Sequence, residues 1–148
     1  MIVGLALVCL NVTDLDEAKT FYVDVLGLQV GLDQTMDGQR WLTVHAAESP
    51  ELPMMLVVPE PPLVEEPVAG QLRSLIARGY LSIGALRTDD CRRTYTELAA
   101  RGVEMTEEPT ERFYGIDAGF RDPFGNHWRL TQPRNLAEIR SVTDTESF

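Results

Sequence analysis

The sequence predicts an α+β fold built from two tandem βαβββ modules, and three observations lead to this prediction. An amphipathic helical pattern occurs twice, a strand-like apolar run precedes each copy, and three strand-like runs follow each copy. The first helical pattern runs from Asp14 to Gly27 and the second from Asp89 to Gly102, which is the same number of steps. A repeat at this period is typical of the duplication of one supersecondary unit. Coincidence between two ordinary helices is the alternative, and the matching order of strands favours duplication.

The first module spans residues 1–58 and opens with the apolar run Ile2–Leu10. Thr13 is suited to cap the helix that follows, with Asp16 at its third position. Gly27 ends the helix, as a left-handed C-terminal residue does. One helical face is apolar, carrying Ala18, Phe21, Tyr22, Val25 and Leu26. Three strands are then expected at Leu28–Asp33, Arg40–Ala46 and Pro53–Val58, with a hairpin turn at Asp37-Gly38.

A proline-rich linker and a short helix are expected at residues 59–79, because four prolines in this stretch exclude regular structure. The second module spans residues 80–132, and a polar C-terminal tail occupies residues 133–148. The elements expected in the second module are the strand Leu81–Arg87, a helix from Thr88-Asp89-Asp90 to Gly102, and the strands Val103–Met105, Gly115–Phe120 and His127–Thr131.

The charge balance restricts the class of partner. The chain of 148 residues has a net charge of −10 and a pI of about 4.6, which argues against nucleic acid and anionic membranes. Ten of the thirteen basic residues lie after residue 74, so a local positive site is available there. Two cysteines, Cys9 and Cys91, do not form a disulfide framework. With no signal peptide and no membrane span in the pattern, we expect a soluble cytoplasmic protein.

Several motifs occur along the chain: Val12-Thr13-Asp14-Leu15, Ala18, Phe21-Tyr22, Leu26-Gly27, Arg101-Gly102-Val103 and Asp122-Pro123-Phe124-Gly125-Asn126-His127. Together they resemble the vicinal oxygen chelate superfamily, which includes glyoxalase I, bleomycin-resistance proteins and extradiol dioxygenases. The resemblance covers about residues 1–132. It implies a fold of two βαβββ modules that form a curved mixed sheet around a cavity, and paired or swapped modules that commonly form homodimers.

Metal-dependent members of that superfamily bind one divalent ion with His or Glu from the first and fourth strand of each module. The matching positions in this sequence are Leu7, Leu56, Gly84 and Arg129. None is a suitable ligand, since divalent metals take anionic or imidazole donors and arginine stays protonated. The resemblance is therefore to a member without the metal ligands, and we expect neither metal nor cofactor.

Strand alternation predicts which side chains line the cavity. Asp117, Arg121, His127 and Arg129 are expected on its polar half, because Trp128 and Leu130 form the apolar face of their strand. The first module adds apolar walls, including Trp41, His45 and Leu56, and Tyr114 lies with Arg112 on a loop that could act as a lid. The candidate ligand-binding residues are Trp41, His45, Leu56, Tyr114, Arg121, His127 and Arg129.

Purely structural roles, without contact to a ligand, stay open for these candidates. Arg121 and Arg129 are equally able to neutralise Asp117 and another acid across strands. Trp41 is as suited to a core as to a ligand platform, and Cys9 and Cys91 have the pattern of small buried residues.

Three functions follow from these observations. The first is a metal-independent small-molecule-binding protein that sequesters an antibiotic-like or aromatic compound, as a homodimer. The second is a glyoxalase-like lyase, isomerase or dioxygenase-type enzyme acting next to a carbonyl. In that case His127 would act as acid and base with Asp117 orienting it, and Arg121 or Arg129 would stabilise an anion. The third is a structural or regulatory dimer whose cavity has collapsed. The acidity favours a cationic guest and the arginines an anionic one, which the sequence leaves open.

Overall fold

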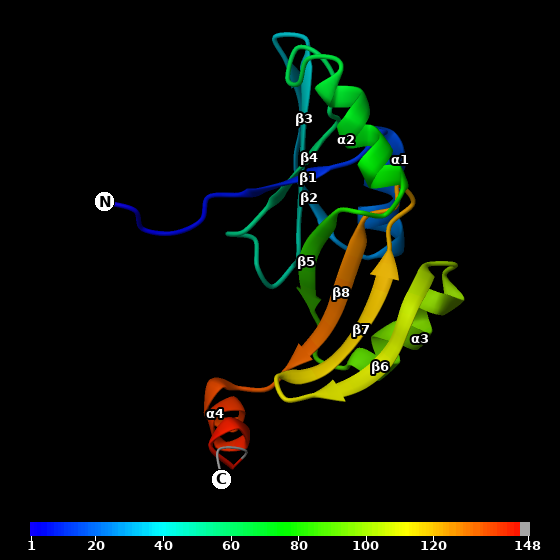
Figure 1. Cartoon of the computed structure of the whole chain (residues 1–148). Helices are drawn as coiled ribbons and strands as arrows, with labels where there is room; N and C mark the ends of the chain where they lie inside the picture. The colour runs from blue at the N-terminus through cyan, green and yellow to red at the C-terminus, as the bar shows by residue number, and fades with distance from the viewer. Residues whose placement is uncertain (146–148) are drawn as a thin grey trace. The chain divides into compact units, whose positions relative to one another are not determined.

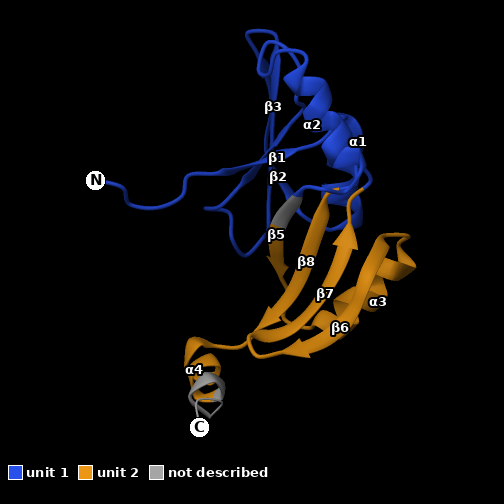
Figure 2. Cartoon of the chain, in the orientation of Figure 1, with its two compact units in different colours: residues 1–81, 123–125 blue, residues 82–122, 126–148 orange. Residues whose placement is uncertain are grey.

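The computed structural model describes the backbone of residues 1–145 and the side chains of all of these except residues 82–83 and 142–145. The elements follow one another as two βαβββ series, each of which makes its own four-stranded sheet (Figure 1). Two compact units result (Figure 2): residues 1–81 with 123–125, and residues 82–122 with 126 onward. The predicted α+β fold with a duplicated module is confirmed.

The first unit contains one mixed sheet with the strand order β1-β4-β3-β2. β1 and β4 pair in parallel, and the other neighbours are antiparallel. The predicted linker segment 59–67 forms no helix or strand, and a short helix follows it as expected. The elements are β1 Val8–Asn11, α1 Leu15–Lys19, the π-helical turn Thr20–Val25, β2 Gln29–Met36, β3 Gln39–His45, β4 Met54–Val57 and α2 Val68–Ala77.

The second unit repeats this topology with the strand order β5-β8-β7-β6. β5 and β8 pair in parallel, and the hairpins β6–β7 and β7–β8 are antiparallel. Helix α3 packs against this sheet (Figure 1). The elements are β5 Ser82–Arg87, α3 Cys91–Ala100, β6 Glu104–Arg112, β7 Gly115–Arg121, β8 His127–Pro133 and α4 Leu136–Thr145.

Both repeated helices begin at an aspartate and end at a left-handed glycine. Asp14 Oδ1 accepts a hydrogen bond from the backbone N–H of Glu17 at 2.8 Å, and Asp90 Oδ1 accepts one from that of Arg93 at 3.0 Å. These side chains satisfy backbone N–H groups that the first helical turn leaves unpaired. The cap of the first helix is therefore Asp14 and not Thr13, and the true equivalent of Asp14 is Asp90 and not Asp89.

One extra residue distinguishes the first helix from the second. Thirteen steps separate Asp14 from Gly27, but only twelve separate Asp90 from Gly102. The first helix accommodates the additional residue as the π-helical turn Thr20–Val25, where the N–H of Leu26 bonds the carbonyl of Phe21 five residues earlier. The apolar face thereby stays aligned, and the adjacent pair Phe21 and Tyr22 are both buried.

The helix-facing side of each sheet supplies the core. In the first unit Leu10, Leu42 and Leu56 occupy neighbouring positions on three strands and are almost fully buried. In the second unit the rings of Phe120 and Trp128 lie stacked, with centroids 6.5 Å apart. Each such side chain contributes about 1.5–3 kcal/mol by leaving water. Residues of alternate parity are left for the opposite side of each sheet.

Several predicted boundaries are wrong. β1 begins at Val8 and not at Ile2, and β2 runs to Met36 and not to Asp33. β6 runs to Arg112 and not to Met105, so Arg112 belongs to a strand and not to a loop. The charged residues and Pro109 concealed the strand, but β6 is a sheet edge, where proline is tolerated, and its pairing is interrupted between Glu107 and Thr110. The C-terminal tail forms the helix α4, and the last part of the predicted tail, residues 146–148, lies outside the described residues.

No helix among the described residues combines the length and the apolar character that a membrane span requires.

Candidate functional site

Each sheet packs its helix against one side, and we call the other side its open face. On the open face of the second unit, β7 and β8 place three pairs of side chains opposite each other: Asp117 with Thr131, Gly119 with Arg129, and Arg121 with His127. Opposed residues of antiparallel strands share a face. The predicted alternation of the last two strands is confirmed, since Trp128 and Leu130 are buried while His127 and Arg129 are half-buried.

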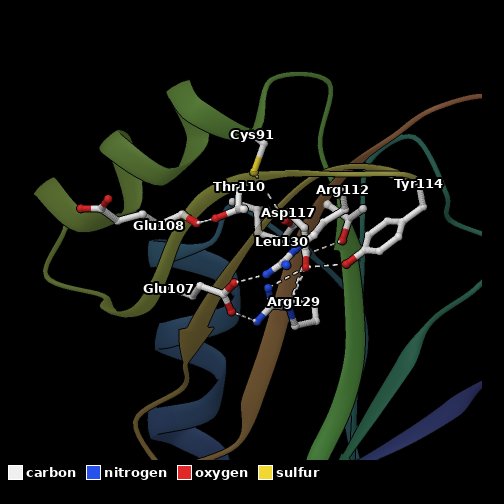
Figure 3. Close-up of polar contacts among 10 residues, drawn as sticks. Cys91, Glu107, Glu108, Thr110, Arg112, Tyr114, Asp117, Arg129 and Leu130 are labelled. Atoms are coloured by element: carbon white, nitrogen blue, oxygen red, sulfur yellow. Dashed lines mark hydrogen bonds and ion pairs between the residues drawn. The ribbon is translucent and has the colours of Figure 1, made fainter. Parts of the chain in front are cut away.

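A hydrogen-bonded carboxylate lies at the centre of this face (Figure 3). The Asp117 side chain is only 3% exposed and accepts hydrogen bonds from four donor groups, one of which, Nε of Arg129, is shared between both carboxylate oxygens. Arg129 donates two of them to Oδ2, from Nε at 3.1 Å and from Nη2 at 2.6 Å. The Tyr114 hydroxyl donates to Oδ2 at 2.8 Å, and the Thr131 hydroxyl donates to Oδ1 at 3.1 Å. A buried carboxylate is stable only when it is paired and hydrogen-bonded in this way.

Arg129 extends the network to a second carboxylate. Its Nη1 donates to Oε2 of Glu107 at 2.8 Å, and Nη2 of Arg112 donates to Oε1 of the same side chain at 2.6 Å (Figure 3). The side chains alternate in charge as Asp117, Arg129, Glu107 and Arg112, and come from three adjacent strands. We call these four side chains with Tyr114 the ion-pair network.

The ion-pair network favours the charged forms of its two carboxyl groups, Asp117 and Glu107. Burial raises the pKa of Asp117, but the hydrogen bonds from Arg129, Tyr114 and Thr131 outweigh it, so this pKa lies below its ordinary value. Arg129 lowers the pKa of Glu107 in the same way. The bond to the Asp117 carboxylate raises the pKa of Tyr114, which therefore remains a hydrogen-bond donor. Arg129 thus neutralises Asp117 and a second acid, Glu107, across the strands, which is one of the two roles that the sequence left open for it.

A close approach of the backbone makes room for Arg129. A Cβ atom on Gly119 would lie 2.9 Å from Nη1 of Arg129 and 2.7 Å from Oγ1 of Thr106. Both separations are shorter than a non-bonded contact permits, so any larger residue would displace the guanidinium. Gly119 thus allows the arginine to lie across the sheet between its two carboxylates.

His127 belongs to a different pair from the one predicted. Its Nε2 accepts a hydrogen bond from Nε of Arg121 at 2.8 Å, and Arg121 also lies 3.7 Å from Glu104. His127 lies opposite Arg121, which is four residues along β7 from Asp117, so the backbone positions are separated by roughly 13 Å. The expectation that Asp117 orients His127 is therefore wrong on geometry.

The open face of the first unit carries few charges. Trp41, Thr43 and His45 alternate along β3 on this face, and Met55 lies beside Thr43 on β4. Trp41 is half-buried, which leaves part of its ring accessible. His45 Nδ1 lies 3.0 Å from the carbonyl oxygen of Ala46. These placements agree with the alternation predicted for β3.

Two predicted placements in the first unit are wrong. Leu56 does not lie on the open face, because it pairs with the buried Leu10 and Leu42 on the helix-facing side and is only 2% exposed. The four-residue apolar strand gave no alternation from which its parity could be judged. Cys9 is exposed on β1 and is not a small core residue, whereas Cys91 is buried as expected.

The family is established by its sequence model. Residues 4–130 match the model of the Glyoxalase/Bleomycin resistance protein/Dioxygenase superfamily, and the chain belongs to that superfamily. Among solved structures, UcmS2 is 39% identical with a TM-score of 0.84, covering 88% of this chain and 98% of its own. TnmS3, an antibiotic-binding protein from Streptomyces sp. CB03234, is 31% identical with a TM-score of 0.72, covering 90% and 98%. An uncharacterized protein of Shewanella frigidimarina is 33% identical over 127 residues, covering 84% of this chain and 90% of its own.

The divalent metal of this superfamily does not fit the residues present. On the open faces the first and fourth strands carry Cys9 and Met55 in one unit and Ala85 and Arg129 in the other. Only Cys9 offers a good transition-metal donor, and Arg129 is a cation held by two carboxylates. Nowhere in the part of the chain that the structure describes do three or more His, Cys, Asp or Glu side chains gather as a metal site would require.

Sequence reasoning missed one member of the network and misjudged another. Glu107 was missed because the strand was expected to end at Met105. Tyr114 was expected on a lid, but it occupies the tight β6–β7 turn and its hydroxyl bonds Asp117. No alternation of apolar and polar residues marks this strand, and its pairing with β7 is interrupted between Glu107 and Thr110, so no signal in the sequence identifies Glu107.

Proposed function

We propose that this protein is a metal-independent small-molecule-binding protein that holds an antibiotic-like or aromatic compound and releases it unchanged. The observation that carries the proposal is the mutual pairing of the polar groups on the open face of the second unit. Asp117 accepts hydrogen bonds from four donor groups, and Glu107 lies between two guanidinium groups. Groups that are paired in this way serve as fixed hydrogen-bonding partners and not as a general acid or base.

The open face of the first unit, taken by itself, is also suited to an aromatic compound. Trp41 presents a partly accessible indole ring beside Met55 and Val57, which are also half-buried. Ligand sites are mostly apolar with a small number of placed polar groups, and an aromatic platform favours a flat guest. The ligand-binding role of Trp41, His45, Tyr114, Arg121, His127 and Arg129 is part of this proposal.

The relationship to an antibiotic-binding protein supports the same conclusion. TnmS3, an antibiotic-binding protein, is 31% identical over nearly its whole length. Binding without turnover also agrees with the separation of His127 from Asp117, because the acid–base pair of the enzyme alternative is not formed.

Equilibrium dialysis against bleomycin and against the tricyclic aromatic acridone, followed by mass spectrometry, tests the proposal. We expect saturable retention of at least one of the two by protein dialysed against EDTA, and recovery of that compound with its mass unchanged. A product of altered mass, or binding that requires an added divalent metal, would contradict the proposal. Stoichiometric zinc, nickel, manganese or iron in protein purified without chelator would contradict its metal-independent part.

We further propose that the protein acts as a cytoplasmic homodimer. The N-terminal residues Ile2, Val3, Leu5 and Leu7 are exposed and apolar, and they lead into β1, which is an edge of its sheet. An apolar exposed edge is a site at which another chain pairs. The free thiols of Cys9 and Cys91 agree with a reducing compartment. Light scattering should give twice the chain mass of 16.6 kDa, and a value of 16.6 kDa would contradict the dimer.

A further inference from the structure

The open face of the second unit carries arginines, as an anion-binding site does, but carboxylates balance their positive charge. Three arginines and three carboxylates of β6, β7 and β8 are linked in ion pairs there: Arg112, Arg121, Arg129, Glu104, Glu107 and Asp117. Their charges sum to zero. A receptor for a carboxylate or phosphate instead presents an excess of positive charge.

We propose that this face selects against anions and that the guest is an uncharged aromatic molecule, with the arginines acting as neutralised hydrogen-bond donors. This inference rests on the proposed function and adds the charge class of the ligand. An anion brought to these six side chains would lose its hydration without meeting net positive charge from them, which is unfavourable. The overall charge of −10 adds long-range repulsion of the same sign.

Arg129 shows the balance in detail. Nε and Nη2 are taken by Asp117 and Nη1 by Glu107, so the side on which a carboxylate would form its strongest two-point contact is occupied. Two of its five N–H groups are left by these contacts. A carbonyl or ether oxygen of an uncharged guest can accept a hydrogen bond from them at no cost in charge burial.

One further arginine lies on this face. Arg87 of β5 is opposite Thr131 in the sheet register and is exposed. An exposed charge at a sheet edge is screened by water, and a single pair formed there contributes little to binding. It therefore does not turn the face into an anion site, and its substitution provides a separate check.

Two probes with the same tricyclic skeleton test the inference: uncharged acridone and anionic acridine-9-carboxylate, titrated calorimetrically into the full chain. We expect native protein to bind the carboxylate at least fivefold more weakly than acridone. Glu107→Gln removes one negative charge between Arg129 and Arg112 while retaining an acceptor oxygen, and it should strengthen carboxylate binding at least threefold. Glu108→Gln makes the same change of net charge at the exposed neighbouring residue and should leave both affinities unchanged.

The outcomes separate this inference from the proposed function. Carboxylate binding by native protein as tight as that of acridone would overturn the inference while leaving small-molecule binding intact. Loss of that binding in Arg87→Gln would then identify Arg87 as the anion site. An equal effect of Glu107→Gln and Glu108→Gln would also overturn the inference, because the effect would then be one of overall charge. Failure of bleomycin and both acridine probes to bind would contradict the proposed function itself.

Discussion

The two units share a topology but carry opposite chemistry on their open faces. By strand register, the positions of Asp117, Arg129 and Glu107 in the second unit correspond to those of Trp41, Met55 and Leu32 in the first. Three charged side chains linked by ion pairs therefore replace an aromatic ring, a thioether and an aliphatic group. The helix-facing sides hold an apolar core in both units, with Leu56 and Leu130 as equivalent residues.

This difference separates what the duplicated fold requires from what its site uses. The core, the aspartate caps and the glycine ends of the helices occur in both units, because each unit must bury one face of its sheet and end its helix. The open faces are not needed for that purpose and have diverged. One face has become suited to a flat apolar group and the other to fixed hydrogen bonds.

Replacement of Arg129 by methionine, the residue at the equivalent position of the first unit, should have the largest effect on stability. Arg129→Met leaves the buried Asp117 carboxylate without its cation, and we expect a loss of about 3 kcal/mol in the free energy of unfolding, measured by urea denaturation. Arg93→Met, which removes an exposed helical pair with Glu97, should leave the free energy of unfolding nearly unchanged, because water screens that pair. Equal losses in the two variants would contradict a structural role for the network.

Removal of both Asp117 and Arg129 should lower the free energy of unfolding by less than the sum of the losses in the two single variants. Asp117→Leu alone leaves Arg129 with Glu107 only, whereas the double variant Asp117→Leu/Arg129→Met gives this position the apolar character of the first unit. We expect a coupling free energy of about 1–3 kcal/mol from the double-mutant cycle. Additive losses would show that the two side chains do not act as a pair.

Gly119→Ala tests the close approach under Arg129. The added Cβ would displace the guanidinium or Thr106, and we expect a loss of about 1–2 kcal/mol in the free energy of unfolding. Gly4→Ala is the matched control, since nothing lies within 4 Å of its added Cβ. An unchanged thermal midpoint in both variants would contradict the close approach of Gly119 to Arg129.

The smallest effect is expected from acidification. The pKa values of Asp117 and Glu107 lie below those of the unfolded chain, so the unfolded state binds more protons as the pH falls. The stabilisation of the folded state by these two carboxylates is present above about pH 4, near the ordinary carboxyl pKa. It is lost as the pH falls below that value. Asp117→Asn should therefore lose less stability between pH 5 and pH 3 than native protein does. Asp24→Asn, an exposed charge-matched control, should follow the native curve, and a native-like curve for Asp117→Asn would contradict the network.

The sequence was sufficient for the fold because its signals are local. Aspartates at helix starts, glycines at helix ends and the alternation in β3, β7 and β8 predicted both modules and the open-face positions of Trp41, Asp117 and Arg129. The parity of Leu56 was misjudged because every residue of β4 is apolar. The partners of Asp117 and Arg129 could not be derived, because Tyr114, which bonds Asp117, and Glu107, which bonds Arg129, belong to a hairpin whose bulges and proline conceal its register.

Calorimetric titration of acridone into native protein in the presence of EDTA, compared with Trp41→Ala, tests the division between the two faces most directly. The account predicts metal-independent binding of native protein that Trp41→Ala weakens at least tenfold, with Trp41→Phe intermediate because it retains a ring. Circular dichroism should confirm that these variants keep the fold, since Trp41 is only half-buried. Unchanged affinity in Trp41→Ala, or binding abolished by EDTA, would contradict the account.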